Sequence, residues 1–304
     1  MRWEDFRSSD NVEDRRGEGG GGGGGFPGGG AGGLGIGTIV ILCIIGWVTG
    51  INPAILIGGA EQMSGGGQPR QERVDPQTQA QRKTKPTDES GRFAAAILGN
   101  TEDVWKEILP NQTGKQYHPT GMVLYTGGTR SGCGSAQAAM GPFYCPLDKK
   151  VYLDTSFFKE MEQQFGVKGD FAYAYVIAHE VGHHVQDELG ILGKVQGRQQ
   201  AASSKVESNQ LSVRVELMAD CLAGVWAKRE NDRKAFLEAG DIDQGLAAAS
   251  AVGDDTLQQE TQGRVVPDAF THGTSEQRMR WFKRGFDSGD PGVCDTFRGA
   301  YAGL

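Results

Sequence analysis

Residues 171–184 carry the strongest pattern in the chain and read Phe171-Ala172-Tyr173-Ala174-Tyr175-Val176-Ile177-Ala178-His179-Glu180-Val181-Gly182-His183-His184. The first half is apolar on nearly all sides, which predicts a buried helix. Asp170 can cap the start of this helix, and Gly190 can end it. The histidines and the glutamate at the end of such a helix need partners, because burying them unpaired costs several kcal/mol.

The spacing of the two outer histidines predicts a metal site. Residues four apart on a helix differ by about 400°, so His179 and His183 lie one turn apart on one face. Both imidazoles can therefore reach one zinc ion, at about 2.0–2.1 Å. Glu180 lies about 100° from His179, where it can serve as a general base rather than as a ligand. A surface helix with ordinary, solvated histidines is the alternative, and the apolar flank argues against it.

A second helix predicted over residues 213–226 supplies the missing ligand. A catalytic zinc uses three protein ligands and keeps one position open. Glu216 and Asp220 are four residues apart on this helix and share a face. We expect Glu216 to be the third ligand and Asp220 to accept a hydrogen bond from the far ring nitrogen of a ligand histidine. The alternative is a helix whose charged face is solvated.

The chain divides into an N-terminal part with an anchor and a C-terminal domain. The uncharged stretch over residues 34–57 has the length of about 20 apolar residues that a spanning helix needs. We expect a transmembrane helix there, after a disordered charged and Gly-rich segment at 1–33 and before a linker at 58–91. A cleaved signal peptide is the rival interpretation, but its apolar part lies closer to the N-terminus. Residues 92–304 suffice for one sizeable core.

Charge and cysteine content narrow the function and the compartment. The formal net charge of -7 excludes general nucleic-acid binding, which needs a basic face. Cys133, Cys145, Cys221 and Cys294 lie beyond the predicted span and allow three pairings, and the turn residues between the first two favour bridging them. Four free thiols in a reducing cytosol are the alternative. Disulfides, if they form, favour the periplasmic or extracellular side for the domain, and so does the small excess of arginine before the span.

The remaining pattern predicts an α+β domain that is mainly helical. Pro110 marks the end of the first expected helix. The expected helices cover residues 93–109, 156–164, 170–190, 213–226, 235–257 and 271–286, and the expected strands cover 122–125, 143–145 and 150–153.

Larger motifs carry a family resemblance. His-Glu-x-x-His followed by Glu-x-x-x-Asp on a later helix resembles the gluzincin group of metallopeptidases. Nearly the whole chain is similar to the bacterial "putative neutral zinc metallopeptidase" family. The matching features are Arg2-Trp3, the Gly tract, the apolar span, Ala178-His179-Glu180-Val181-Gly182-His183-His184, Glu216-Leu217-Met218-Ala219-Asp220-Cys221 and Thr271-His272-Gly273-Thr274-Ser275-Glu276-Gln277-Arg278.

The resemblance implies a fold and a set of roles. It implies a zincin-like domain with a small antiparallel sheet, a Zn²⁺ cofactor and a peptide or protein substrate. His179, His183 and Glu216 carry over as ligands, Glu180 as the base and Asp220 as the partner of a ligand.

The resemblance also suggests groups that contact the substrate. In gluzincins a donor outside the zinc helices stabilises the oxyanion, and His272 is the best candidate, with Arg278 or Arg280 behind it. A histidine that only satisfies its own loop is the rival interpretation. In zincin-like folds an edge strand also binds extended peptide. We expect His184 to be structural, because it lies about 100° round the helix from His183.

Two hypotheses follow from these features. The first is a single-pass, inner-membrane zinc peptidase. The second is a membrane-tethered zinc-binding scaffold or assembly protein without proteolytic activity. Glu180 favours the first, because a structural zinc site has no use for a water-activating carboxylate. Hydrolysis of a non-peptide amide, as in cell-wall material, is a further option, and the sequence predicts no oligomeric state.

Overall fold

The structure, a computed structural model, describes residues 1–17, 85–137 and 141–304. Within these ranges the chain is mainly helical with two small sheets, so the predicted α+β class is confirmed. The predicted span at 34–57 lies outside the described residues, as do most of the Gly-rich segment and most of the linker. Of the helices that are described, none combines the length and the apolar character that crossing a bilayer requires.

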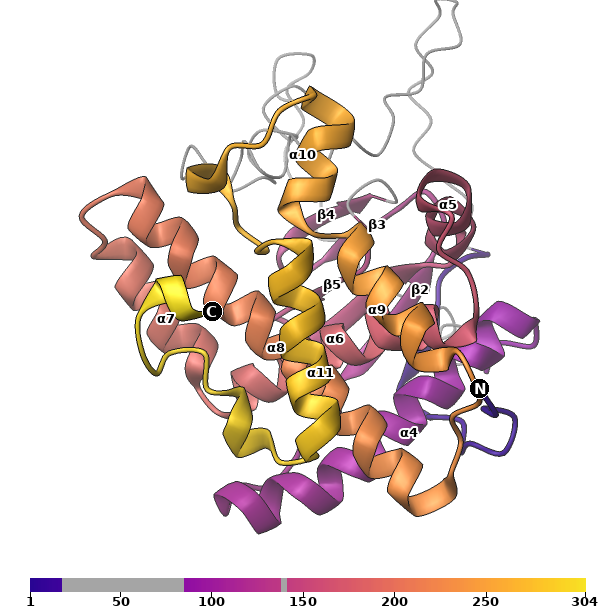
Figure 1. The fold of residues 1–304 in the computed structure, drawn as a ribbon. Helices are drawn as coiled ribbons and strands as arrows, with labels where there is room; N and C mark the ends of the chain where they lie inside the picture. The colour runs from indigo at the N-terminus through magenta and orange to yellow at the C-terminus, as the bar shows by residue number, and fades with distance from the viewer. Residues whose placement is uncertain (18–84, 138–140) are drawn as a thin grey trace, which may run out of the picture.

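Four long helices build the body of the fold: α4 (Glu89–Thr113), α6 (Asp170–Glu188), α8 (Lys205–Lys234) and α11 (Ser275–Ser288). Helix α8 contacts the other three (Figure 1). The shorter helices are α5 (Ser156–Phe165), α7 (Ile191–Gln200), α9 (Asp241–Ala251), α10 (Asp254–Gln262), η2 (Pro267–Ala269), η3 (Pro291–Cys294) and η4 (Tyr301–Gly303).

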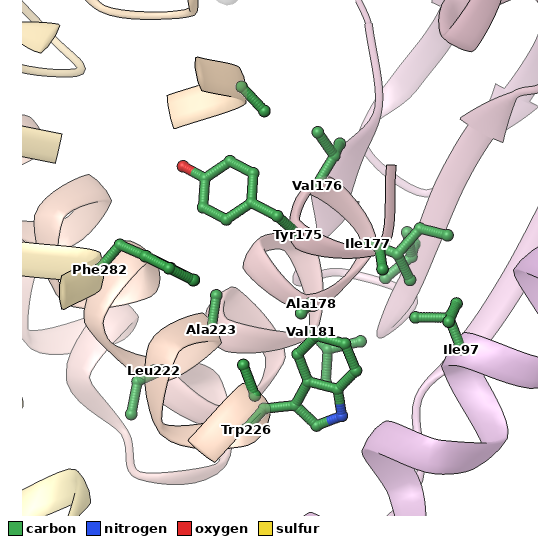
Figure 2. Close-up of a cluster of buried hydrophobic side chains, with 14 of the residues drawn as sticks. Ile97, Tyr175, Val176, Ile177, Ala178, Val181, Leu222, Ala223, Trp226 and Phe282 are labelled. Carbon is green, nitrogen blue, oxygen red and sulfur yellow. The ribbon is translucent and has the colours of Figure 1, made fainter. Parts of the chain in front are cut away.

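Apolar side chains from all four of these helices contribute to the core. Figure 2 shows Ile97 of α4, Ile177 of α6 and Trp226 of α8 in this cluster, all of them buried. Full burial of a side chain of this size stabilises the fold by about 1.5–3 kcal/mol. The indole N–H of Trp226 donates to the Asn100 side chain at 2.8 Å, so the core leaves this polar atom paired.

Helices α8 and α11 cross very closely because two glycines lie at the crossing. A Cβ added at Gly224 would lie 2.1 Å from the carbonyl oxygen of Phe282. A Cβ at Gly285 would lie 1.9 Å from the carbonyl oxygen of Cys221. Real Cβ atoms do not approach backbone so closely. The absence of these side chains therefore sets how deeply α11 packs against the helix that carries Glu216.

The main sheet has the order β1-β2-β6-β5, with β1 (Val12–Asp14), β2 (Gly121–Tyr125), β5 (Phe143–Cys145) and β6 (Lys150–Asp154). The three predicted strands are confirmed as β2, β5 and β6. Strands β1, β2 and β6 run parallel and only β5 is antiparallel, so the expectation of an antiparallel sheet holds for β5 with β6 and is wrong for the other pairs. In this sheet β6 lies between β2 and β5. The sequence of a single strand does not show which strands will be its neighbours, so it could not predict these directions.

A hairpin and two disulfides join distant segments. Strands β3 (Gly128–Ser131) and β4 (Gly134–Gln137) form a separate two-stranded sheet. Cys133 in the hairpin turn is bonded to Cys145 at the end of β5. Cys221 of α8 is bonded to Cys294, which holds the C-terminal segment against the central helices. Of the three pairings that the sequence allows, the structure adopts this one.

Residues 1–17 belong to the folded domain, so the prediction of a disordered segment over 1–33 is wrong for this part. Met1, Phe6 and Val12 are buried. Strand β1 pairs with β2, and Arg7 donates to the buried carboxylate of Glu102 at 2.6 Å. The segment has few apolar groups, but each meets a matching site on the domain. Local composition cannot reveal such long-range complementarity.

Two predicted helix boundaries also change. Helix α4 starts earlier than expected and continues past Pro110, and it ends where Gly114 adopts a left-handed conformation and its N–H bonds the Pro110 carbonyl. The helix expected over 235–257 is two helices, α9 and α10, with Gly253 between them. Gly253 packs against Ser275, the first residue of α11, because a Cβ added to Gly253 would lie 2.5 Å from the Ser275 nitrogen. The break between α9 and α10 therefore lies where α11 begins.

Candidate metal centre

The structure brings together the three residues that the sequence proposes as metal ligands. His179 and His183 lie one turn apart on α6, and Glu216 lies on the facing side of α8. The Nε2 atom of His179 is 3.2 Å from Glu216 Oε2, and Nε2 of His183 is 3.5 Å from Glu216 Oε1. One possible ligand atom from each residue lies within 4.8 Å of the others. Two imidazoles and one carboxylate are a donor set typical of catalytic zinc.

Each histidine is held with its Nε2 atom toward this centre. His179 donates from Nδ1 to Asp220 Oδ1 at 2.8 Å. His183 donates from Nδ1 to Gln186 Oε1 at 2.9 Å, and the Gln186 amide nitrogen donates to the Val215 carbonyl at 2.7 Å. With a metal bound, these bonds would keep one proton of each ring on Nδ1 and turn the lone pair of Nε2 toward the metal.

Sequence reasoning proposed Asp220 but missed Gln186. Gln186 is fully buried and follows His183 by three residues, so it lies on the same side of α6. That spacing was the available signal. The pattern alone did not show that its amide would face the ring of His183 rather than another helix.

The electrostatics of the cluster favour a positive charge at its centre. Burial alone would raise the pKa of Glu216, but the two imidazoles lower it well below its usual value. Burial alone would lower the pKa of His179, but the carboxylates of Asp220 and Glu216 raise it to about 10. The pKa of His183 is also raised, against burial, by Glu216. A divalent cation supplies the same positive charge, so these residues fit a metal.

Glu180 lies beside the cluster and is not part of it. Its side chain is buried on α6, and this burial raises its pKa. The positive charges of His183 and His179, and to a smaller extent the backbone of Tyr144 in β5, partly offset the effect of burial. A carboxylate with a raised pKa next to a metal site is suited to proton transfer near neutral pH.

His272 lies in the loop before α11 and is bound by Asp254. The His272 ring donates from Nδ1 to Asp254 Oδ1 at 3.1 Å. The other oxygen of Asp254 accepts backbone N–H bonds from Thr271, His272 and Gly273 at 2.7, 2.6 and 3.0 Å. Burial would lower the pKa of His272, but Asp254 raises it, and Glu216 adds to this effect. Sequence reasoning missed Asp254, for which the pattern held no signal.

Arg278 occupies a different place from the one expected. The sequence suggested it behind His272, but its guanidinium lies behind His179, where Nε and Nη2 donate to the two oxygens of Asp220 at 2.9 Å each. The Tyr175 hydroxyl donates to Asp220 as well, at 2.5 Å. Arg278 is buried on α11, whereas Arg280 is exposed. The carboxylate that holds His179 is thus itself held by two other elements.

His184 contacts groups outside the cluster, in line with the structural role expected for it. Its Nε2 donates to the His118 carbonyl at 2.6 Å, and its Nδ1 lies 3.0 Å from the Tyr144 hydroxyl. That hydroxyl also donates to Asp187 at 2.9 Å. Burial lowers the pKa of His184, and the ring joins α6 to β5 through Tyr144.

The chain is similar to one protein family and to bacterial relatives. A sequence profile described as "Putative neutral zinc metallopeptidase" matches residues 1–297. "Uncharacterized protein YpfJ" of Escherichia coli strain K12 is 51% identical over 298 residues, which cover 98% of this chain and 99% of that protein. "Uncharacterized protein Rv2575" of Mycobacterium tuberculosis strain H37Rv is 48% identical over 217 residues, which cover 67% of this chain and 70% of that protein. No solved structure matches the chain.

Proposed function

Since the chain belongs to the family described as "putative neutral zinc metallopeptidase", we propose that it is a zinc-dependent peptidase whose metal is held by His179, His183 and Glu216. The observation that carries the proposal is the convergence of two Nε2 atoms and one carboxylate, with a buried glutamate beside them. The order of the motifs and the packing of α6 on α8 support a zincin-like fold of the gluzincin type.

Glu180 is the proposed general base. A bound zinc ion would polarise the substrate carbonyl and acidify the attacking water. Glu180 takes the proton of that water, since burial makes its carboxylate more basic than an exposed one. The same carboxyl group then delivers the proton to the leaving amine.

His272 is the proposed donor to the developing oxyanion. Asp254 fixes the ring through Nδ1, which leaves Nε2 to face the substrate. Because Asp254 raises the pKa of His272, the ring carries its second proton up to a higher pH than an ordinary histidine. A protonated ring donates the charge-assisted hydrogen bond that a negatively charged oxygen needs.

Strand β5 is the proposed binding edge for an extended peptide. It ends the main sheet, and in the described part of the chain its ladder partner is β6 alone. Strand β5 contacts α6, and the backbone of Tyr144 lowers the pKa of Glu180, so β5 runs beside the helix that carries the proposed base. A peptide added to this edge as a further strand would carry its carbonyl groups past the metal centre.

Location is part of the proposal. We propose attachment to the membrane through residues 34–57, with the catalytic domain on the periplasmic or extracellular side. The two disulfides support that side, because such bonds persist in oxidising compartments.

Zinc analysis and a proteolysis assay on the full chain test the proposed function. Wild type and Glu180→Gln are expected to bind one zinc each, whereas only wild type cleaves denatured protein. The exposed Glu162→Gln on α5 is the matched control and is expected to retain both properties.

Two outcomes contradict the proposal. Zinc in both proteins, with no cleavage of protein or peptide by wild type, would support the scaffold alternative. Cleavage of cell-wall amides alone would change the substrate class.

A further inference from the structure

We infer that Arg278 is a positioning residue that acts on His179 through Asp220; the inference rests on the proposed metal centre. The guanidinium donates to both oxygens of Asp220 at 2.9 Å, in the two-bond geometry that lysine cannot reproduce. Asp220 in turn accepts from His179 Nδ1 at 2.8 Å. The series of hydrogen bonds from Arg278 through Asp220 to His179 is continuous, and all three side chains are buried.

The need for Arg278 follows from the burial of Asp220. The side chain of Asp220 has 0% exposure, and an isolated carboxylate at such a depth is expensive to keep charged. Arg278 satisfies this carboxylate with two hydrogen bonds, one to each oxygen. Without Arg278, Asp220 would be free to rotate, and a rotated carboxylate would no longer accept from His179 Nδ1 or fix the orientation of the ring.

Arg278 also ties three other elements to this carboxylate. Its Nη2 lies 3.3 Å from the Tyr175 hydroxyl on α6, and Nη1 donates to the Val252 carbonyl at the end of α9 at 3.2 Å. Arg278 itself lies on α11, whose N-terminal loop carries His272. One side chain therefore links the orientation of a metal ligand to the helix that positions the proposed oxyanion donor.

The expected effect is on zinc affinity, independently of cleavage. Loss of a hydrogen-bond partner behind a ligand histidine weakens metal binding by about 10–100-fold. Arg278→Lys keeps the charge but loses the two-bond geometry, so it is expected to weaken zinc binding within this range. Arg280→Lys, two residues away on the same helix and exposed, is the matched control and is expected to bind zinc as wild type does.

A double-mutant cycle separates positioning from general stability. Zinc dissociation constants are measured by competition with a chelator for Arg278→Lys, Asp220→Asn and the double variant. If Arg278 acts through Asp220, the double variant binds zinc no more weakly than the weaker single variant. The inference would be overturned if the two single-variant losses of zinc affinity multiplied in the double variant. It would also be overturned if Arg278→Lys bound zinc as tightly as wild type. If the arginine variant does not fold, Tyr175→Phe removes one bond to the same carboxylate and is expected to weaken binding by a smaller factor; an unchanged affinity there would also refute it.

A failure of the proposed function gives a different result. If the wild-type chain bound no zinc, or bound zinc and cleaved nothing, the peptidase proposal would fail by its own readout. The affinity ratio between Arg278→Lys and wild type is informative even when no substrate is known.

Separate contacts carry a second inference: we infer that residues 1–17 and 85–304 lie on the same side of any membrane. Strand β1 pairs with β2, and Ser9 donates its N–H to the Ala95 carbonyl at 2.9 Å. Arg16 pairs with Asp88 at 2.5 Å, so the chain leaves the domain and returns to it at neighbouring points. A single crossing between residues 17 and 85 would pull these partners apart.

This inference departs from the single-pass arrangement that the sequence predicts, because it puts residues 1–17 and the domain over 85–304 on one side of a membrane. The N-terminal segment also shares the redox compartment of the two disulfides, since all three belong to one folded unit. The attachment proposed for residues 34–57 therefore cannot place the N-terminus and the catalytic domain on opposite sides.

Cysteine labelling of the full chain in cells tests this topology. Asp5→Cys and Lys106→Cys, both at exposed positions, are made separately after Cys43→Ser removes the remaining free thiol. A membrane-impermeant maleimide is applied before and after permeabilisation. Both sites are expected to show the same pattern. Labelling of one site in intact cells, with protection of the other, would overturn the inference.

Discussion

Replacing Gln186 by leucine is expected to weaken zinc binding although Gln186 touches no metal. Its side chain is fully buried, accepts from His183 Nδ1 at 2.9 Å and donates to the Val215 carbonyl at 2.7 Å. Leucine has a similar size and can make neither bond. The His183 N–H and the Val215 carbonyl would be left without their partner.

The magnitude follows from these two bonds. Each buried group left unpaired costs about 1–3 kcal/mol, so the free energy of unfolding of the zinc-free protein is expected to fall by about 2–6 kcal/mol. Loss of the bond that orients the His183 ring is expected to raise the zinc dissociation constant by about 10–100-fold. This factor corresponds to about 1.4–2.7 kcal/mol.

Two measurements on the same protein check both numbers. Urea unfolding of the zinc-free protein gives the stability, and titration against a competing chelator gives the zinc affinity. Gln199→Leu is the matched control, because Gln199 donates to Ser212 across α7 and α8 at 2.9 Å without touching a ligand histidine. Zinc affinity of Gln186→Leu within about threefold of wild type, well below the range expected for such a partner, would refute the proposed role, whatever happened to stability.

Further predictions concern pH, the C-terminal disulfide and the helix crossing. The folded pKa of His179 is about 10, above its ordinary value of 6.5, so its contribution to stability is complete below pH 6.5 and is lost as the pH rises through 10. The melting temperature of the zinc-free protein should therefore fall from pH 7 to 10 and the added stability from zinc should grow, which thermal melts with and without chelator would show; a flat zinc-free profile would contradict this. Replacing Cys221 and Cys294 by alanine opens a large loop and should lower the free energy of unfolding by about 2–5 kcal/mol in denaturant titrations, and an unchanged midpoint would refute it. Gly224→Ala should destabilise by about 1–3 kcal/mol or more, because its Cβ meets the Phe282 carbonyl; wild-type stability in the same titration would contradict the close crossing.

Local periodicity is enough to identify much of the candidate site. A helix places residues four apart on one face, so the sequence alone shows His179 with His183, and Glu216 with Asp220, as pairs. The apolar flank of the first pair predicts its burial. These inferences succeed because helix geometry depends on neighbouring residues and varies little from one helix to another.

Other features depend on which distant segments meet. The sequence by itself determined a mainly helical α+β domain, two helices with polar pairs and the type of metal that they suit. Only the tertiary structure decided that β1 comes from the N-terminus, that the sheet is mostly parallel, and that Gln186, Asp254 and Arg278 hold the site residues. The physical reason is that each of these outcomes depends on packing and hydrogen bonds between complementary surfaces. A repeating local pattern records the face that a helix or strand buries, but not the partner that it meets there.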